Sequence, residues 1–334
     1  MANTVHSTKR LRVGIVGGSI AGCAAAVALL RTGQNVSVFE SSPNELTGRG
    51  AGIGTQMSVL RALRERDLID VDMPYFHAKG FPHVGRTPAG DRLGRTAWVA
   101  PITTELLNWG DLYRNLRKRL PDMVYHQGHE VTAAQMADGE PVVLQLADGS
   151  EQAFDVVVFA DGYWSLGRRL LFPEVALQYR GYVLWRGVLE ERELTESAPL
   201  EGVMTRVGYS QGYCAIYFVP GHAGSVAKGT RWVNWACYTR VSAAELSHFL
   251  TDRTGRQHTG SLPPGTMRLE EEARLKHLAR ANFPPYFSEI VNATQATFVQ
   301  PIFSTQVPAY HKGRCCLVGD AGTLASPTKQ QRCL

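Results

Sequence analysis

The alternation of apolar and polar segments predicts a βαβ unit at the start of the chain. Leu11 to Val16 is an apolar, β-branched run without polar alternation, which is typical of a buried parallel strand. The glycine-rich turn Gly17 to Gly22 follows, and the Ala/Leu-rich segment after it predicts a helix that ends at Gly33. Asn35 to Phe39 is a second apolar run and ends at Glu40, so strand, helix and strand follow in order.

The rest of the chain predicts more α/β structure, followed by a region of a different character. Helices are predicted over 58–67, 109–120, 245–249 and 270–281, and a Gly-rich loop over 45–54. Asp148-Gly149 predicts a hairpin turn between apolar runs, and 155–160 and 314–318 read as buried parallel strands. From about Leu177 onward, short aromatic strands alternate with Gly-rich turns over 182–188, 203–207, 213–219 and 231–238, before a strand over 297–302. We therefore expect the α/β class with an inserted, mainly antiparallel sheet.

Composition and charge leave this picture unchanged. The chain has 334 residues, 44% of them hydrophobic and 19% charged, and a net charge of +5, which are ordinary values for a globular protein. A basic cluster at 114–119 is interpreted as the solvated face of a helix, with nucleic-acid binding as the weaker alternative. The six cysteines have no zinc spacing, and the N-terminus has no secretory pattern, so we expect a cytoplasmic protein without a metal site.

The turn after the first strand has the composition of a pyrophosphate site. Glycine permits a tight turn and a close approach to phosphate, and the following helix contributes partial positive charge at its N-terminus. Gly17 and Gly22 occupy the outer positions of the dinucleotide fingerprint, and Ser19 replaces its middle glycine. Glu40, at the end of the second strand, is placed to accept hydrogen bonds from ribose hydroxyls. The pattern predicts a bound dinucleotide, either NAD or FAD.

Two later acidic turns favour FAD. Asp161 begins the segment DGYWSLGR, which fits D-G-x-x-S-x-x-R and follows a buried strand. Gly319-Asp320-Ala321 follows the strand CCLV in the same way. Ligands of open α/β sheets bind at the carboxyl ends of the strands, where both acids are expected. An NAD dehydrogenase does not need these two turns, so an NAD-only reductase is disfavoured.

The three motifs, in this order, resemble the FAD-dependent aromatic hydroxylases of the p-hydroxybenzoate hydroxylase type. Two stretches, YRGYVLWRGV (179–188) and WVNW (232–235), resemble the 2,6-dihydroxypyridine 3-monooxygenase branch, as does GGSIAG. The resemblance implies a Rossmann-like FAD-binding domain over 8–175 with smaller inserted segments, a substrate-binding β-sheet domain over 176–298, and a return to the first domain over 299–334. It implies that FAD is bound by Gly17, Gly18, Ser19, Ile20, Ala21, Gly22, Glu40, Ser41, Arg49, Asp161, Asp320 and Ala321.

The resemblance also implies the reaction. NAD(P)H reduces the flavin, O2 forms a flavin C4a-hydroperoxide, and its distal oxygen is transferred to an aromatic or heteroaromatic ring. Tyr217 and Gln56 are the catalytic candidates, and Asn234 and Trp235 the substrate-binding candidates, although alternation along the strands does not say which face meets the substrate. The choice between NADH and NADPH, the ring and the oligomeric state stay open, and a homodimer is one of the states considered.

Other interpretations of the same residues carry less weight. Gly208-Tyr209-Ser210-Gln211-Gly212 spells a hydrolase elbow, but the strand-like segment after it predicts a hairpin turn. The histidine pairs 77/83 and 126/129 have no third ligand in register for a metal. After Pro327 the polar segment TKQQRCL has no helical period, where the resemblance implies a further Gly-rich turn and helix. We therefore expect a truncated end, with an inactive or weakly flavin-binding remnant as the alternative function.

Overall fold

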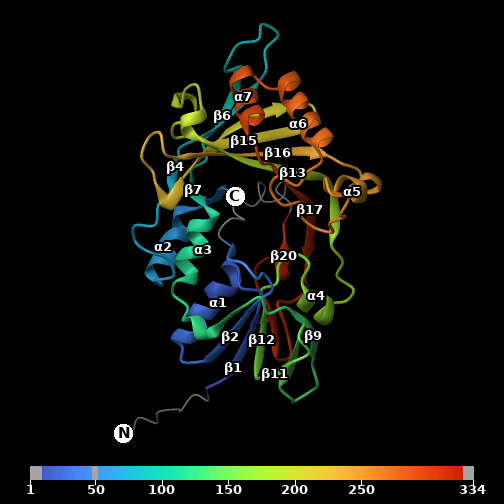
Figure 1. Cartoon of the computed structure of the whole chain (residues 1–334). Coiled ribbons are helices and arrows are strands. Elements are labelled where there is room, and N and C mark those ends of the chain that lie inside the picture. The colour runs from blue at the N-terminus through green and yellow to red at the C-terminus, as the bar shows by residue number, and fades with distance from the viewer. Residues whose placement is uncertain (1–9, 47–51, 326–334) are drawn as a thin grey trace. The chain divides into compact units, whose positions relative to one another are not determined.

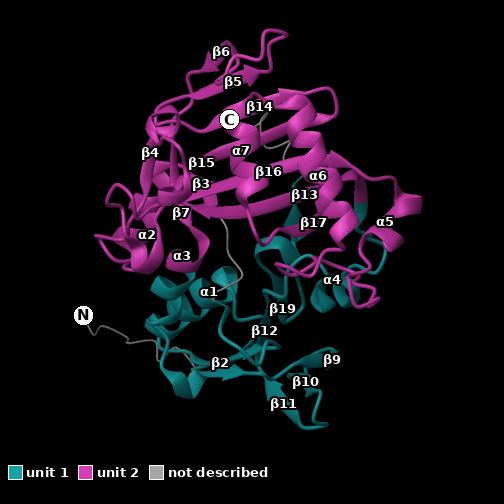
Figure 2. Ribbon diagram, turned by 45° about the horizontal axis from the view of Figure 1, so that its top comes forward, with its two compact units in different colours: residues 1–48, 113–178, 303–334 teal, residues 49–112, 179–302 magenta. Residues whose placement is uncertain are grey.

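A computed structural model describes residues 10–46 and 52–325 of the chain (Figure 1). The chain divides into two compact units, which Figure 2 shows in different colours. Unit 1 takes residues 1–48, 113–178 and 303–334, and unit 2 takes residues 49–112 and 179–302. The sequence-based boundaries assigned residues 49–112 to the first domain, whereas in the structure these residues group with the β-sheet unit.

Unit 1 is built on a parallel sheet with the strand order β18-β19-β12-β1-β2-β8. Its strands are β1 (Arg12–Val16), β2 (Asn35–Glu40), β8 (Tyr125–Gln127), β12 (Val156–Phe159), β18 (His311–Lys312) and β19 (Cys315–Leu317). Only the edge strand β18 pairs antiparallel among the described strands of this sheet. In the middle, β1 lies between β2 and β12, so strands from distant parts of the sequence are neighbours.

Helices and a small antiparallel sheet complete unit 1. Helix α1 (Ile20–Arg31) packs against β1 and β2, and the short helix α4 (Leu166–Leu171) packs against β12 and β19. The antiparallel sheet contains β9 (Val131–Gln135), β10 (Val142–Leu146) and β11 (Glu151–Phe154). Its Leu144 and Phe154 belong to the same buried cluster as Phe39 and Phe159. Gly14 permits this contact, because a Cβ there would lie 2.8 Å from the Phe154 ring.

Unit 2 contains most of a long, mainly antiparallel sheet with the order β20-β17-β13-β16-β15-β14-β5-β6. Its strands are β5 (Phe81–Gly85), β6 (Arg95–Ala100), β13 (Gln178–Glu190), β14 (Thr205–Tyr209), β15 (Gly212–Val219), β16 (Trp232–Arg240), β17 (Phe298–Gln306) and β20 (Thr323–Leu324). The last strand, β20, pairs with the end of β17 that belongs to unit 1. The pair β14–β5 is parallel and interrupts the antiparallel pattern.

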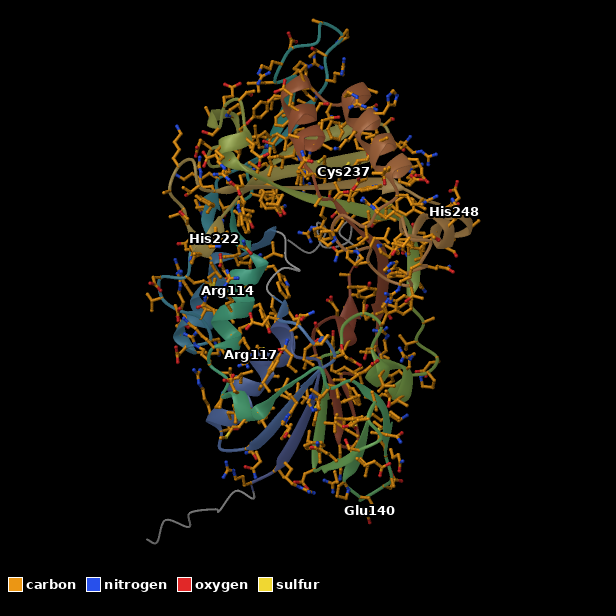
Figure 3. The ribbon with its side chains drawn as sticks, in the orientation of Figure 1. Arg114, Arg117, Glu140, His222, Cys237 and His248 are labelled. Carbon is orange, nitrogen blue, oxygen red and sulfur yellow. The ribbon has the colours of Figure 1, made fainter. Side chains whose placement is uncertain are left out.

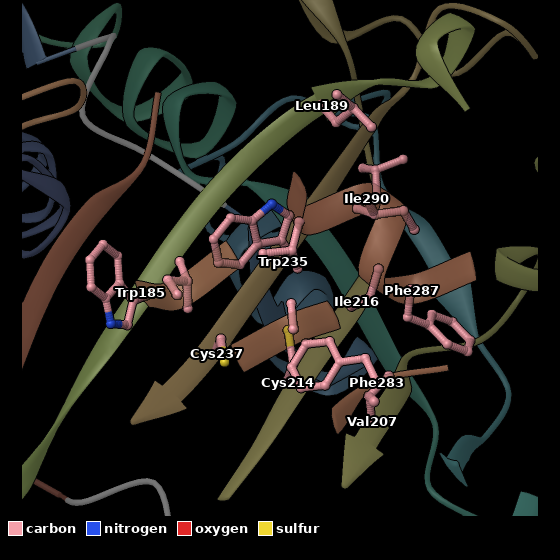
Figure 4. Packing of buried hydrophobic residues seen from close by; sticks show 14 of the residues in the cluster. Trp185, Leu189, Val207, Cys214, Ile216, Trp235, Cys237, Phe283, Phe287 and Ile290 are labelled. Carbon is pink, nitrogen blue, oxygen red and sulfur yellow. The ribbon is translucent and has the colours of Figure 1, made fainter. Parts of the chain in front are cut away.

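The two faces of this sheet are covered differently. One face carries the main apolar cluster of unit 2, in which Ile216 and Trp235 of the sheet meet Phe283, Phe287 and Ile290 (Figure 4). The helices on this face are α5 (Ala243–Phe249), α6 (Leu269–Asn282) and α7 (Pro285–Ala293). The other face carries a smaller cluster with a second small sheet, formed by β3 (Gly52–Thr55), β4 (Phe76–Ala78) and β7 (Thr104–Asn108). In the sequence, helix α2 (Met57–Glu65) lies between β3 and β4, and helix α3 (Trp109–Arg117) directly follows β7.

Most predicted elements are present, and the fold class is confirmed. The predicted strand–helix–strand unit is β1, α1 and β2, and Gly33 follows the helix with a positive φ of 82°. The predicted loop over 45–54 is wrong at its end, because Gly52–Thr55 forms strand β3 against β7. Helix α7 was not predicted, because the pair Pro284-Pro285 is typical of a loop. Proline is also favoured in the first turn of a helix, and here an apolar helix follows it.

Candidate functional site

The turn between β1 and α1 has the backbone geometry that its glycines predict. Gly17 has φ +96°, a conformation that L side chains rarely adopt, and a Cβ there would lie 2.4 Å from the Ala160 carbonyl oxygen. A Cβ on Gly22 would lie 1.9 Å from the carbonyl oxygen of Gly17. The first turn of α1 carries no acidic residue, so its backbone N–H groups and partial positive charge favour an anion. The turn therefore fits a pyrophosphate.

Glu40 is buried beside this turn and stiffens it. One carboxylate oxygen accepts from the N–H of Gly18 at 2.9 Å, and the other accepts from the N–H of Ser42 at 2.8 Å. The Tyr125 hydroxyl donates to the carbonyl of Gly18 at 2.9 Å, so Gly18 is held at both its N–H and its carbonyl. Ser19, Ile20 and Ala21 are partly exposed at the helix start, and Ser41 is exposed. The structure thus gives Glu40 a role in shaping the turn.

Asp161 lies at the end of β12 and caps the next helix. Its Oδ2 accepts from the N–H groups of Leu166 at 2.6 Å and Gly167 at 3.3 Å, which belong to the first turn of α4. Burial raises its pKa, and the hydroxyl of Ser165 and these backbone N–H groups act in the opposite direction. Its Oδ1 is buried and lacks a hydrogen-bond partner among the described residues. That oxygen can accept one more hydrogen bond from a ligand.

Arg168, the last residue of the D-G-x-x-S-x-x-R motif, joins the second acidic turn to the third. Its side chain is 2% exposed, and its guanidinium donates to the carbonyl oxygens of Tyr163, Asp320 and Ala321. The N–H groups reach Asp320 at 3.4 Å and Ala321 at 3.0 Å. Arg168 was not among the residues predicted from the sequence to form the site. The motif's spacing was the available signal, since Ser165 at its centre caps α4 and places Arg168 in the first turn.

The third turn, Gly319–Ala321, completes the convergence. Gly319 has φ +60°, and a Cβ there would lie 2.9 Å from the Cβ of Ala21 at the start of α1. Asp320 is solvent-exposed, and nearby protein raises its pKa by desolvation. The three predicted motifs therefore meet at the carboxyl ends of β1, β12 and β19 in unit 1. Close backbone approach, a helix N-terminus and free carboxylate oxygens suit the phosphates and hydroxyls of FAD.

In unit 2, three side chains of the large sheet hold one glycine. Asn234 Oδ1 accepts from the N–H of Gly52 at 2.7 Å. The carbonyl of Gly52 accepts from Tyr217 at 3.0 Å and from Arg186 Nη2 at 2.5 Å. A Cβ on Gly52 would lie 2.6 Å from the Tyr217 ring, so only glycine fits. We call Arg186, Tyr217 and Asn234 the Gly52 clamp.

The remaining substrate and catalytic candidates lie apart from this clamp. Trp235 is fully buried on the face that α6 and α7 cover, and its Nε1 donates to the Thr294 hydroxyl at 2.8 Å. It is a core residue of unit 2 in this structure. Gln56 is exposed and precedes α2 as its N-terminal cap residue. Arg49 and the segment from Pro327 onward lie outside the described residues.

The less favoured motifs resolve into structural roles. The G-x-S-x-G sequence is the hairpin between β14 and β15, as predicted. His77 pairs with Glu105 at 2.8 Å, and His126 stacks on Phe39 with ring centroids 5.2 Å apart. The described residues contain no group of three or more His, Cys, Asp or Glu that could hold a metal ion. Among the same residues, no helix has the length and apolar character needed to cross a membrane.

The predicted basic cluster is only partly a solvated face. Figure 3 labels Arg114 and Arg117 on α3. Arg114 is exposed, whereas the guanidinium of Arg117 lies 4.2 Å from the centroid of the Tyr125 ring. Arg117 also donates to Asp122 at 2.7 Å. Arg119, beyond the helix, donates to the carbonyl of Asn115 at 2.7 Å. Arg117 and Arg119 therefore make contacts within unit 1.

Comparison with known proteins identifies relatives over nearly the whole chain. The family profile described as FAD binding domain-like matches residues 179–304. A 2,6-dihydroxypyridine 3-monooxygenase of Paenarthrobacter nicotinovorans is 28% identical over 95% of this chain and 77% of its own length. A 6-hydroxynicotinate 3-monooxygenase of Pseudomonas fluorescens is 28% identical over 93% of this chain and 75% of its own length.

A solved structure agrees with these relatives. The 2,6-dihydroxypyridine-3-hydroxylase from Arthrobacter nicotinovorans superposes with a TM-score of 0.86 at 26% identity, over 96% of this chain and 79% of that one. The fold class, the resemblance to FAD-dependent aromatic hydroxylases and the class of enzyme, an FAD-dependent monooxygenase, are confirmed at this level. The individual site residues stay predictions.

Proposed function

We propose that this chain, a relative of the FAD-dependent aromatic hydroxylases, uses NAD(P)H and O2 to hydroxylate a small, electron-rich aromatic or heteroaromatic ring. The observation that carries the proposal is the meeting of three turns at one edge of the parallel sheet. Gly17 packs on Ala160, Gly319 packs on Ala21, and Arg168 binds the carbonyls of the third turn. A simple NAD-binding unit needs only the first of these turns.

Each turn has a proposed part in holding the cofactor. The N–H groups of residues 17–22 would bind the pyrophosphate. Each carboxylate oxygen of Glu40 accepts one N–H, from Gly18 or Ser42, and its remaining lone pairs would accept hydrogen bonds from the adenosine ribose. Asp161 Oδ1 and the exposed carboxylate of Asp320 would face the rest of the dinucleotide. Bound FAD would supply the redox chemistry, and the protein would orient the ring and exclude water.

The substrate would lie against the face of the large sheet that carries the Gly52 clamp. This face is polar at its centre, whereas the opposite face is filled by the apolar cluster under α6 and α7. Tyr217 is 5% exposed, and burial raises the pKa of its hydroxyl. The neighbouring Arg186 acts in the opposite direction, but the net shift is upward. A phenol that donates to Gly52 and has a raised pKa is a poor base, so we propose positioning as its role. Gln56 stays a candidate at the start of α2.

The proposal is tested by turnover with a defined panel of rings. The purified chain, reconstituted with FAD, is mixed with NADH or NADPH and with hydroxylated pyridines or benzoates, and nicotinamide oxidation is followed at 340 nm. Ring-dependent oxidation together with a hydroxylated product supports the proposal. A protein that binds FAD but oxidises NAD(P)H at the same rate with and without every ring contradicts it.

A further inference from the structure

The Gly52 clamp leaves two buried hydrogen-bond donors unused. Asn234 is 0% exposed, and its Nδ2 has no hydrogen-bond partner among the residues that the structure describes. The Nε of Arg186 is buried and unpaired in the same sense. A buried N–H without an acceptor has lost its hydrogen bonds to water without replacement, so such groups in a native protein call for a partner.

The clamp fixes where these donors lie. Asn234 binds the N–H of Gly52 and Arg186 binds its carbonyl, so both side chains meet the same residue. Since the N–H of Gly52 can only donate, it fixes Oδ1 of Asn234 as the acceptor and Nδ2 as the free donor. Tyr217 lies directly opposite Asn234 in the β15–β16 register and is held by the same glycine. The clamp therefore presents N–H groups in a fixed orientation.

The balance of donors and acceptors selects a ligand. Nδ2 of Asn234 and the guanidinium of Arg186 can only donate hydrogen bonds. The Tyr217 hydroxyl already donates its proton to the carbonyl of Gly52. The complement is an acceptor oxygen, such as the oxo or oxido group of a hydroxylated ring. An amino group at that position would bring donor against donor, which is the strongest basis for discrimination in a buried site.

We infer that Asn234 is a specificity-determining residue, whose Nδ2 donates to a ring oxygen of the substrate and rejects ring amines. The inference rests on the proposed function and adds to it the chemical class of the substrate at the clamp: a small ring that carries an acceptor oxygen. Arg186 supports this preference with positive charge beside the same oxygen, and its Nη2 keeps the clamp in place.

The test replaces the donor and keeps the clamp. In Asn234→Asp, one carboxylate oxygen still accepts from Gly52, while the other puts an acceptor where Nδ2 was. The matched control is Asn108→Asp, because Asn108 is also buried, accepts from Gly110 at 2.9 Å and donates to the Pro220 carbonyl at 3.2 Å. Both Oδ1 and Nδ2 of Asn108 therefore have a partner within the protein. Dissociation constants of 2,6-dihydroxypyridine and 2,6-diaminopyridine are measured from the change in flavin absorbance of the FAD-bound proteins.

The expected results follow from the swap of donor for acceptor. The unaltered chain binds the dihydroxy ring at least tenfold more tightly than the diamino ring. Asn234→Asp retains FAD and lowers this ratio by at least tenfold, whereas Asn108→Asp loses thermal stability and keeps the ratio. The inference is overturned by an unchanged ratio in Asn234→Asp, by loss of FAD from that variant, or by an equal shift in Asn108→Asp. Failure of the proposed function itself is seen separately, as the absence of ring-dependent turnover in the unaltered chain.

Discussion

The guanidinium of Arg168 donates to the main-chain carbonyl of Ala321 at 3.0 Å, although 153 positions separate them in the sequence. Through this bond and those to Asp320 and Tyr163, one buried cation connects two of the three cofactor turns. The arrangement supplies charged donors to the carbonyls of Asp320 and Ala321, in the turn that follows β19. It also makes the position of the third turn depend on the second.

Arg168→Gln is predicted to weaken FAD binding at least tenfold and to destabilise the protein by about 3 kcal/mol, because buried carbonyls lose their charged donor. Fluorescence titration with FAD and chemical denaturation measure the two effects. Arg169→Gln is the matched control, since its side chain is exposed and donates only to the carbonyl of Trp164 among the bonds described. Equal losses in both variants would show that Arg168 has no special place in the site.

Gly17→Val is predicted to abolish flavin retention while leaving a folded protein. The new side chain would meet the Ala160 carbonyl and would be strained at φ +96°. Gly33→Ala provides the control, because Gly33 also has a positive φ of 82° but a Cβ there meets nothing within 4 Å. We expect the control to cost about 1–2 kcal/mol of stability and to keep its flavin. The ratio of absorbance at 450 nm to that at 280 nm separates the two, and a yellow Gly17→Val protein would refute the placement of the pyrophosphate.

Cys23 is predicted to be unreactive in the native protein. Burial raises the pKa of its thiol to about 12, and the sulfur donates to the Gly18 carbonyl at 3.1 Å. Since the thiolate is the reactive form, the native rate of alkylation should keep rising with pH from 7 to 10. In urea it should level off above pH ~8.5, the ordinary thiol value. Iodoacetamide labelling with mass spectrometry of the Cys23 peptide measures both rates, and equal rates at pH 8 would contradict the buried position.

Asp252 is predicted to make folding stability depend on pH in the acid range. Hydrogen bonds from His258 and then from Thr254 hold its pKa well below the usual value. A carboxyl whose pKa is lowered by folding stabilises the protein at pH values above its unfolded pKa of ~3.9. This stabilisation is lost as the pH falls below that value. Asp252→Asn should therefore melt earlier than the unaltered chain at pH 7, with a difference that shrinks from pH 5 to pH 3. A deficit independent of pH would contradict this, and Asp91→Asn, an exposed aspartate bonded to Thr87, is the control.

The sequence could predict the α/β framework because its signals are local. The apolar run at 11–16, the glycines of the first turn and the acids after two later strands each report on a short stretch of backbone. Parallel strands then bring those stretches to one edge, whatever their distance in sequence. For the same reason the hairpin at Gly208–Gly212 could be told from a nucleophile elbow by the alternation after it.

Contacts between distant side chains could not be predicted. Alternation places Asn234 and Trp235 on opposite faces of β16, but only the packing of Phe287 and Ile290 on Trp235's side shows which face is apolar. Gly52 read as a loop because glycine disfavours strands, whereas the clamp of Arg186, Tyr217 and Asn234 holds it extended. The apolar face of β16 and the extended conformation of Gly52 are set by tertiary contacts, so no local sequence pattern predicts them.

Incorporation of oxygen from 18O2 tests the central claim most directly. The purified chain is reconstituted with FAD and incubated with NAD(P)H, 2,6-dihydroxypyridine and 18O2, and the product is analysed by mass spectrometry. We predict a yellow protein and a ring product heavier by one 18O atom, formed only when flavin and reduced nicotinamide are both present. A colourless protein that cannot be reconstituted, or flavin-bound protein whose product contains no 18O with any ring of the panel, would contradict the account.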